Sequence, residues 1–270
     1  MRLATSNIAL PAFAHIDALA HLPKMGFTGL EVAPSRVWRD TWHGLGRAAV
    51  DAYRKAVEAA GLTVIGLHSL FFDHPDLGMF RGAEIRRRTL DFLVHLSGLC
   101  RDLGGKTLIY GSRTARTRGA LTPAEAHAEA VDFMGELCRR IDGHGTCFCF
   151  EPLEKEVADF INSAYESLAV VEDVNDPGVG VQLDAKALVA NGEAGPETFA
   201  AVRHHLVHFH ANEPGLGVLG ASGTVDHAAF GGCLRDVGYD GYVSNEQIMV
   251  AGDPFRGLAR SATVLKACYG

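Results

Sequence analysis

The amino-acid sequence predicts an α/β protein with a (β/α)8 TIM-barrel fold, built as a single domain over residues 1–270. Strand-like apolar runs alternate with helical patterns along the whole chain, which is typical of a parallel sheet covered by helices. Eight such repeats favour a closed barrel over an open doubly wound sheet, which is the alternative fold. The open sheet is disfavoured because no glycine-rich phosphate turn follows the first strand, where the sequence TSNIALP stands instead.

Eight short runs have the composition of strands, and each is followed by a helical pattern. The strands are predicted at residues 2–6, 28–32, 63–68, 107–110, 146–151, 179–184, 206–210 and 242–246. The helices are predicted at residues 16–24, 47–60, 85–103, 123–144, 163–171, 196–204, 226–237 and 255–267. Thr122 and Pro123 have the form of an N-cap and a first helical residue. Gly61, Gly104 and Gly238 stand where helices should end.

The fifth strand directs an acidic side chain into the barrel. Alternate side chains of a strand share a face, so Phe148 and Phe150 lie on one face and Glu151 lies on the other. The phenylalanines belong against the covering helices, and Glu151 therefore points inward at the end of its strand. Cys147 and Cys149 share its face and are expected to fill the barrel interior below it.

The same alternation gives three more inward residues at strand ends, namely Asp184, His210 and Glu246. The argument is weakest for Glu246, because Asn245 on the opposite face is polar. Since the active sites of TIM barrels lie at the carboxyl ends of the strands, all four side chains are expected at one mouth. Two glutamates, one aspartate and one histidine suit a divalent metal ion such as Mn²⁺, Mg²⁺, Co²⁺ or Zn²⁺. The arrangement indicates an enzyme.

Composition and charge exclude several classes of protein. Hydrophobic residues make up 47% of the chain, enough for a globular core, and the net charge of −7 disfavours a broad nucleic-acid interface. No apolar run approaches the length of a membrane span, and the N-terminus lacks the pattern of a signal peptide. The six cysteines form no CxxC pair, as fits a reducing compartment. We therefore expect a cytoplasmic protein without nucleic-acid or membrane partners.

Several segments together resemble the xylose-isomerase-like TIM-barrel superfamily, which includes sugar isomerases and the 3-epimerases of ketohexoses and shares its fold with family 2 AP endonucleases. The segments are GLEVAPSRVW, GLHSLFFDHP, LGGKTLIYGSRTAR, FEPLEKEVADFINSAYE, VQLDAKAL, VHFHANEPG and SNEQ. The resemblance spans almost the whole chain. It implies one bound divalent metal ion, held by Glu151, Asp184, His210 and Glu246. It also implies that the two glutamates flank the substrate as proton-transfer groups.

The chemistry of such a site is consistent with these roles. A divalent cation bound to the carbonyl and an adjacent hydroxyl of a ketose makes the neighbouring C–H bond more acidic, because the cation stabilises the enediolate. One carboxylate can then remove the proton, and a second can return it. Two bases on opposite faces give an epimerase and one base gives an isomerase, and the ligand set does not decide between them. We therefore predict a metal-dependent sugar isomerase or epimerase of carbohydrate metabolism with a small sugar or sugar-like substrate.

The chain departs from the family pattern at two positions that normally contact the substrate. Many relatives have a histidine three residues after the metal-binding aspartate, where this chain has Ala187. Sugar 3-epimerases tend to have an arginine six residues after the metal-binding histidine, where this chain has Leu216. Lys186 and Glu213 are nearby polar residues, which are either substrate contacts in their place or exposed charges. The identity of the sugar therefore stays open, including whether it is phosphorylated.

Four further residues are candidates for substrate binding. His68 ends the third strand on its inward face, as a substrate contact or as a core histidine. Glu31 ends the second strand facing inward, where a buried carboxylate needs a partner. The loop GSRTARTRG after the fourth strand places Arg113 and Arg116 at the catalytic end of the barrel. These arginines are expected to hold a phosphate or carboxylate, or else to be solvated surface side chains.

Three other functions fit parts of the pattern. A metal-dependent dehydratase of a cyclic polyol ketone would use the same enolisation. An apurinic endonuclease-like DNA repair enzyme needs a multi-metal cluster, and Tyr110 and Ala187 stand where two of its histidines are expected. The third alternative, a non-catalytic sugar-binding protein, gives no reason for two glutamates to face the metal ion. Four aromatic residues are expected to line the sugar site or to contact another subunit of a homo-oligomer: Trp38, Trp42, Phe71 and Phe72.

Overall fold

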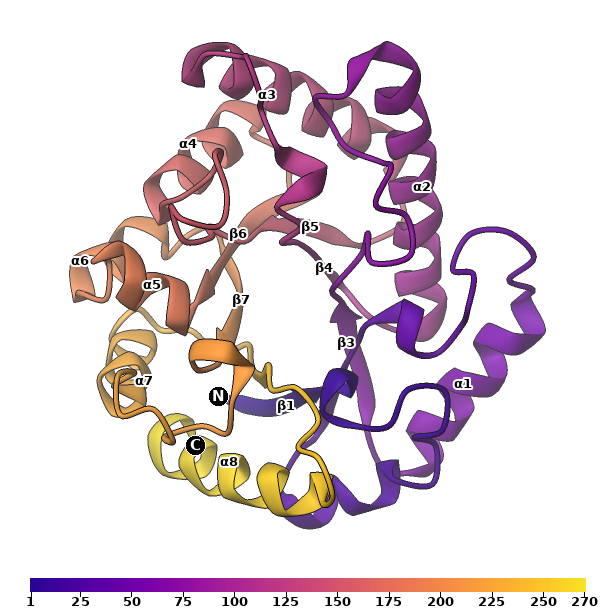
Figure 1. Cartoon of the computed structure of the whole chain (residues 1–270), viewed down its shortest axis with the longest axis vertical. Helices are drawn as coiled ribbons and strands as arrows, with labels where there is room; N and C mark the ends of the chain where they lie inside the picture. Colours follow the sequence, from indigo (N-terminus) through magenta and orange to yellow (C-terminus); the bar gives the residue numbers. More distant parts are fainter.

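The computed structural model describes residues 1–270 and shows eight parallel strands that close into a barrel, with β8 pairing with β1 (Figure 1). The strands are β1 (Arg2–Ser6), β2 (Gly29–Val32), β3 (Thr63–Leu67), β4 (Thr107–Tyr110), β5 (Cys147–Phe150), β6 (Val179–Asp184), β7 (Leu206–Ala211) and β8 (Tyr242–Asn245). Strand order in the barrel follows the sequence. The predicted (β/α)8 fold is therefore confirmed.

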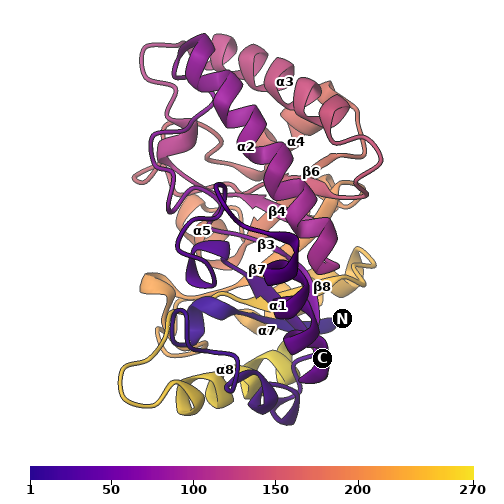
Figure 2. The same ribbon diagram turned by 90° about the vertical axis from the view of Figure 1, so that its right-hand side faces the viewer.

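Helices cover the outside of the barrel. They are α1 (Arg47–Ala59), α2 (Gly82–Leu103), α3 (Pro123–Arg140), α4 (Ala164–Val174), α5 (Ala185–Asn191), α6 (Pro196–Val202), α7 (His227–Asp236) and α8 (Pro254–Tyr269). Short 3-10 helices lie at Asn7–Ala9, Leu19–His21, Pro23–Met25, Pro34–Arg36, Thr114–Arg116 and Pro214–Leu216. Both chain termini lie at the same end of the barrel (Figure 2). No helix has the length and apolar character needed to cross a bilayer.

Packing in the core between the barrel and the helices determines which side chains of each strand point into the barrel. Phe209 of β7 is fully buried against Phe199 of α6 and Phe230 of α7, with ring centroids 6.1 Å and 6.0 Å away. Because neighbouring residues of a strand face opposite ways, this packing directs His208 and His210 into the barrel. The outward positions thus hold aromatic and aliphatic residues, and the inward positions at the carboxyl ends are free for chemistry.

Two elements differ from the sequence prediction. The segment predicted as a helix at residues 16–24 forms only two 3-10 turns, because Pro23 lacks the N–H that a continuous helix needs there. Helix α5 was not predicted, and it begins directly after β6 because the Asp184 carboxylate accepts a hydrogen bond from the Ala187 N–H at 2.8 Å. The predicted start of α3 is confirmed, and Thr122 and Glu125 form a capping box there.

The register of the last three strands brings the predicted ligands to one level. Asp184 of β6 pairs with His210 of β7, and His210 pairs with Ser244 of β8. Glu151 and Glu246 each follow the last residue of their strands, β5 and β8. The four side chains therefore project from the carboxyl ends of β5 to β8, the end of a TIM barrel at which active sites form.

Candidate metal centre

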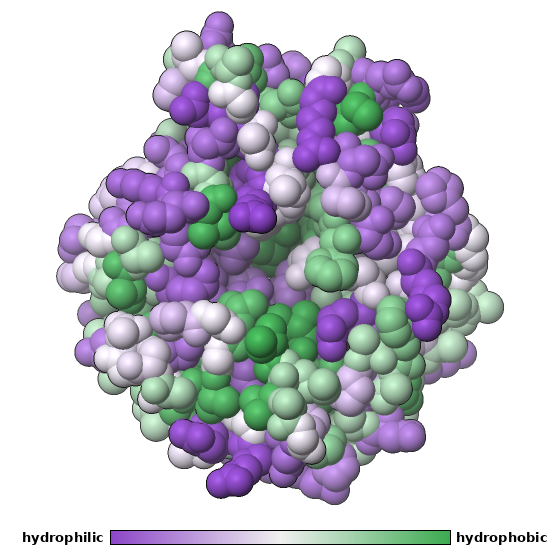
Figure 3. Space-filling view, in the orientation of Figure 1, coloured by the Kyte–Doolittle hydropathy of each residue, from purple (hydrophilic) through white to green (hydrophobic).

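A cavity of about 500 Å³ opens at the carboxyl ends of the strands. Three of the predicted ligands line it, namely Glu151, His210 and Glu246, together with residues of the loops after β3 and β4. Figure 3 shows the hollow near the centre of this face, with hydrophilic residues toward α3 and α4 and hydrophobic residues toward α8. A larger concavity of about 1060 Å³ lies at the opposite end, at the amino ends of β4 to β8, and none of the predicted site residues lines it.

The four predicted ligands converge on one point. Each offers an atom within 4.8 Å of the others: Glu151, Asp184, His210 and Glu246. The Nδ1 atom of His210 is their common neighbour, at 3.2 Å from Oε1 of Glu151 and 3.4 Å from Oε2 of Glu246. Oδ2 of Asp184 lies 4.0 Å from the same nitrogen. Three carboxylates and one imidazole at this spacing are a donor set suited to a divalent cation.

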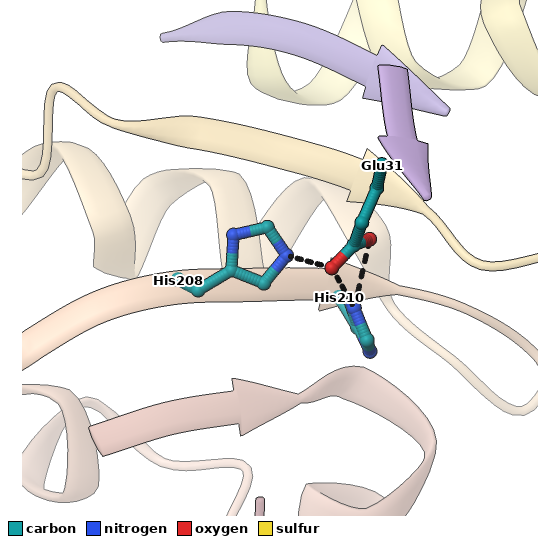
Figure 4. Close-up of side chains that lie close together, drawn as sticks. All are labelled: Glu31, His208 and His210. Atoms are coloured by element: carbon teal, nitrogen blue, oxygen red, sulfur yellow. Dashed lines mark hydrogen bonds and ion pairs between the residues drawn. The ribbon is translucent and has the colours of Figure 1, made fainter. Parts of the chain in front are cut away.

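Glu31 lies on the other side of the His210 ring. Its carboxylate is fully buried, 3.1 Å from Nε2 of His210 and 3.2 Å from Nε2 of His208 (Figure 4). It also accepts a hydrogen bond of 2.6 Å from the Ser244 hydroxyl. Burial alone would raise the pKa of Glu31, but His210, His208 and His68 together hold it well below its usual value. Glu31, His208 and His210 are also close enough to hold a metal ion themselves.

We assign Glu31 to the support of His210. A carboxylate bonded to the outer nitrogen of a ligating histidine fixes the ring orientation and makes the inner nitrogen a better ligand. His210 cannot offer Nε2 to an ion while it donates that N–H to Glu31. Glu31 does not line the cavity, and its contact with a substrate stays a prediction.

Two amide side chains bind the ligand carboxylates, and the sequence interpretation did not assign a role to either. Asn212 donates through Nδ2 to Asp184 and, at 2.9 Å, to Oε2 of Glu246. Gln182 donates to Oε1 of Glu151 at 3.1 Å. Alternation along the strands carries the signal for both, because Gln182 lies two residues before Asp184 and Asn212 two residues after His210. These amides hold three carboxylates in place around the imidazole.

The electrostatics of the cluster favour a bound cation. Burial, together with the nearby charges of Glu151 and Glu246, raises the pKa of Asp184 to about 8. Burial would lower the pKa of His210, but the carboxylates of Glu31 and Glu246 hold it well above its usual value. Buried charges of one sign destabilise one another, and a divalent cation at their centre would neutralise them. The residues present therefore fit a metal ion.

The other predicted substrate residues divide into two groups. His68 and Arg113 line the cavity. His68 is buried, with Nε2 2.5 Å from the Ser6 hydroxyl and Nδ1 3.6 Å from Oε1 of Glu246. Both residues therefore lie at the cavity, and their contact with a substrate stays a prediction.

Lys186, Glu213 and Arg116 do not line the cavity, and their contact with a substrate stays a prediction. Lys186 forms an ion pair with Glu154. Glu213 is buried and accepts hydrogen bonds from the Ser222 hydroxyl, from Gly220 N–H at 2.7 Å and from Nε2 of His227 at 3.0 Å, so both its oxygens are already engaged. Arg116 is fully buried beneath its loop rather than solvated. Lys186 lies in α5, and Glu213 and Arg116 lie in the segments after β7 and β4, so the alternation of side chains along a strand does not predict the direction of any of the three.

The fold and the convergent ligand set define a TIM barrel with a candidate metal centre at its catalytic end. Residues 19–268 match the xylose isomerase-like TIM barrel family, and the chain belongs to this family. The resemblance seen in the sequence is thereby confirmed.

Two curated relatives are sugar epimerases. The chain is 26% identical over 162 residues to a ketose 3-epimerase of Arthrobacter globiformis, covering 60% of this chain and 54% of that protein. It is 26% identical over 168 residues to an L-ribulose 3-epimerase of Methylomonas sp., covering 62% and 56%. The chain thus spans about half the length of these relatives.

Solved structures show the same fold over nearly the full length. A D-psicose 3-epimerase from Clostridium cellulolyticum superimposes with a TM-score of 0.83 at 17% identity, covering 99% of this chain and 98% of the other. A 3-keto-D-glucoside 4-epimerase from E. coli gives a TM-score of 0.83 at 20% identity, with coverage of 99% and 100%. At such identities the similarity establishes the fold.

Proposed function

We propose that this protein is a divalent-metal-dependent ketose isomerase or epimerase that works by proton transfer. The observation that carries the proposal is the placement of Glu151 and Glu246. These glutamates come from β5 and β8, both line the cavity, and both lie within 3.4 Å of the same nitrogen of His210. The names of the curated relatives, a ketose 3-epimerase and an L-ribulose 3-epimerase, support the same class of reaction.

Four residues would hold the metal ion, for which Mn²⁺, Mg²⁺, Co²⁺ and Zn²⁺ are candidates: Glu151, Asp184, His210 and Glu246. When bound, such an ion supplies Lewis-acid polarisation of a carbonyl and its neighbouring hydroxyl. This polarisation makes the C–H bond beside the carbonyl acidic enough for a carboxylate to act on it.

The two glutamates would carry the proton. One removes it from the carbon beside the carbonyl, and the other delivers a proton to the opposite face of that carbon in an epimerase. In an isomerase a single glutamate would move the proton to the adjacent carbon. His68 contacts Glu246 and would keep this carboxylate directed into the cavity. Phe71 and Phe72, which also line the cavity, provide apolar surface for the C–H faces of a sugar.

Product analysis over a panel of ketoses tests the proposal. Metal-stripped protein should be inactive, and added Mn²⁺ or Co²⁺ should restore formation of the epimer or of the aldose. Asp184→Ala removes a ligand and should lose most activity at limiting metal, whereas the control Asp17→Asn alters an exposed carboxylate outside the site and should behave as wild type. Loss of water from a cyclic polyol ketone instead would identify a dehydratase. Full activity in the metal-stripped protein would refute the proposal.

A further inference from the structure

The loop after β4 concentrates positive charge beside the cavity. Three arginines near this loop donate to neutral carbonyl oxygens: Arg81 to Pro75 and Thr114, Arg116 to Tyr110, and Arg118 to Asp159 and Leu121. Arg113 is exposed, and its side chain donates no hydrogen bond and forms no ion pair within the protein. The guanidinium charges on this side of the mouth are therefore not neutralised by carboxylates in contact with them.

Arg113 is the member of this group that faces the cavity. It lines the cavity between Ser112 and Thr114, whose hydroxyls lie 3.2 Å apart, and Ser69 stands on the neighbouring loop. A guanidinium that has no partner within the protein and lines a cavity together with hydroxyl side chains can bind phosphate or carboxylate oxygens. Glu151 also lines this cavity, so one small molecule can contact Arg113 and Glu151 together.

The wall that carries Arg113 is held in place by its neighbours. Arg81 donates to the carbonyl of Pro75 at 2.8 Å and to the carbonyl of Thr114 at 2.9 Å, and both of these residues line the cavity. The loops after β3 and β4 are thereby tied together. Such a tie lowers the entropic cost of binding, because the wall is already ordered before a ligand arrives.

Arg116 adds a buried charge below this wall. Its Nε and Nη2 atoms have no hydrogen-bond partner, and Nη1 makes only a long contact of 3.5 Å with the carbonyl of Tyr110. Burial lowers the pKa of Arg116 to about 10, while the charges of Glu151 and Tyr110 oppose this shift, so the side chain is cationic at neutral pH. A buried cation without full hydrogen bonding is costly to the fold.

We propose that the substrate carries an anionic group, either a phosphate or a carboxylate, at the end remote from its reacting carbonyl, and that Arg113 selects for this group. The inference rests on the proposed function and narrows its substrate class. The carboxylates of the metal centre repel an anion, so the charged end of the substrate lies against Arg113, and the neutral carbonyl end lies near Glu151 and Glu246. This separation of positive and negative charge within the cavity would also fix the orientation in which the sugar binds.

The first test compares matched substrates. Specificity constants are measured for a 2-ketohexose, its 6-phosphate and the 2-ketohexuronate that has a carboxylate at the same carbon. We expect wild type to prefer one of the two anionic compounds over the neutral ketose by roughly 10- to 100-fold. The preferred compound distinguishes a phosphate site from a carboxylate site. Equal specificity constants for all three compounds would overturn the proposal.

Variants of Arg113 test whether this residue confers the preference for an anionic substrate. Arg113→Gln should reduce the ratio of anionic to neutral specificity constants by about 10-fold or more, and Arg113→Lys should keep part of it because the charge remains. Arg87→Gln alters an exposed arginine on α2, where the side chain is 68% accessible, and should leave the ratio unchanged. A preference that survives in full in Arg113→Gln would place the anion elsewhere.

A binding experiment separates this proposal from the proposed function. D-glucitol 6-phosphate and D-glucitol lack a carbonyl and cannot be turned over, so calorimetric titration of metal-loaded protein reports binding alone. If wild type binds D-glucitol 6-phosphate more tightly than D-glucitol and Arg113→Gln does not, the anion site is supported even if no ketose reacts. If neutral ketoses react while the phosphate binds no more tightly than glucitol, a phosphate site at Arg113 is refuted and the epimerase or isomerase function stands.

Discussion

Nε2 of His210 lies 3.1 Å from Oε2 of Glu31 (Figure 4), so the ring presents Nδ1 to the three carboxylates of the metal centre. Glu31 comes from β2 and His210 from β7, so the contact crosses the interior of the barrel. It fixes which nitrogen of the imidazole carries the proton and which is free to bind an ion. The catalytic end of the barrel therefore depends on a residue that does not reach the cavity.

Replacement of this carboxylate should weaken metal binding. Glu31→Gln keeps the volume of the side chain but removes the charge that stabilises His210, and we expect the affinity for Mn²⁺ to fall by roughly 10- to 100-fold. Calorimetric titration of metal-stripped protein measures the effect. Glu129→Gln, an exposed change on α3, is the control. An affinity equal to that of wild type in a folded Glu31→Gln protein would contradict the supporting role of Glu31.

Gly111 leaves the space that the Glu151 carboxylate occupies. A Cβ atom at Gly111 would collide with Oε2 of Glu151. In Gly111→Ala the carboxylate must therefore move, and displacement of a reacting group by about 1 Å can cost roughly 10²-fold in rate. We expect turnover to fall by about this factor, and the melting temperature to change little if the side chain can rotate away.

A matched glycine provides the control for this prediction. Gly232 lies in α7, and a Cβ atom built on it meets nothing within 4 Å. Gly232→Ala should leave turnover unchanged and raise stability slightly, because alanine has the higher helix propensity. Equal turnover in Gly111→Ala and Gly232→Ala would show that the position of Glu151 is not critical.

Strand alternation predicts the positions of the ligands because it is a local property. Phe148 and Phe150 must pack against helices, and Glu151 follows from them without knowledge of the rest of the fold. The partnership of Glu31 with His210 cannot be predicted in this way. It depends on how far each strand is shifted along its neighbour, and the pairing of β2 with β3 has a register shift between Leu30 and Glu31. Tertiary pairing sets this shift.

Loop residues were predicted less well for a related reason. Arg113 and Arg116 are three residues apart in one basic loop, yet the first is exposed at the cavity and the second is fully buried. The 3-10 turn Thr114–Arg116 and its hydrogen bonds with Met79 and Arg81 of the neighbouring loop determine the direction of each side chain. Such a loop has no repeating pattern from which its side-chain directions can be read.

Metal affinity should rise with pH. In the metal-free protein the pKa of Asp184 is raised to about 8 by burial and by the charges of Glu151 and Glu246, and the pKa of His210 is raised well above its usual value despite burial. A cation must displace these protons, so protonation at lower pH favours the metal-free form. Below about pH 8 we expect affinity to increase by roughly tenfold or more for each pH unit.

Proton release provides a direct check of this linkage. Titration with Mn²⁺ in buffers of different ionisation enthalpy gives the number of protons displaced for each ion bound. At neutral pH we expect between one and two protons, since Asp184 and His210 are both protonated in the metal-free protein and each loses a proton on binding. An affinity independent of pH, with no proton released, would show that these groups do not bind the ion.

The final prediction concerns the reaction itself and the two glutamates of the cavity. Glu151→Gln and Glu246→Gln each keep an oxygen for the metal but remove the basic carboxylate, so turnover at saturating Mn²⁺ should fall by roughly 10²- to 10⁴-fold. Metal content measured on the same samples separates this loss from a loss of the ion. Wild type in D₂O should place solvent deuterium on the carbon beside the carbonyl.

The pattern of deuterium uptake in the variants distinguishes the two reactions. In an epimerase each glutamate serves one face, so a single variant should still exchange the proton of one epimer without inverting it, and Glu151→Gln and Glu246→Gln should retain exchange for opposite epimers. In an isomerase one variant should lose exchange and turnover together, because a single base performs both steps. Product formed by wild type without any deuterium would instead indicate a hydride shift, and full activity in both variants would exclude the pair from the reaction.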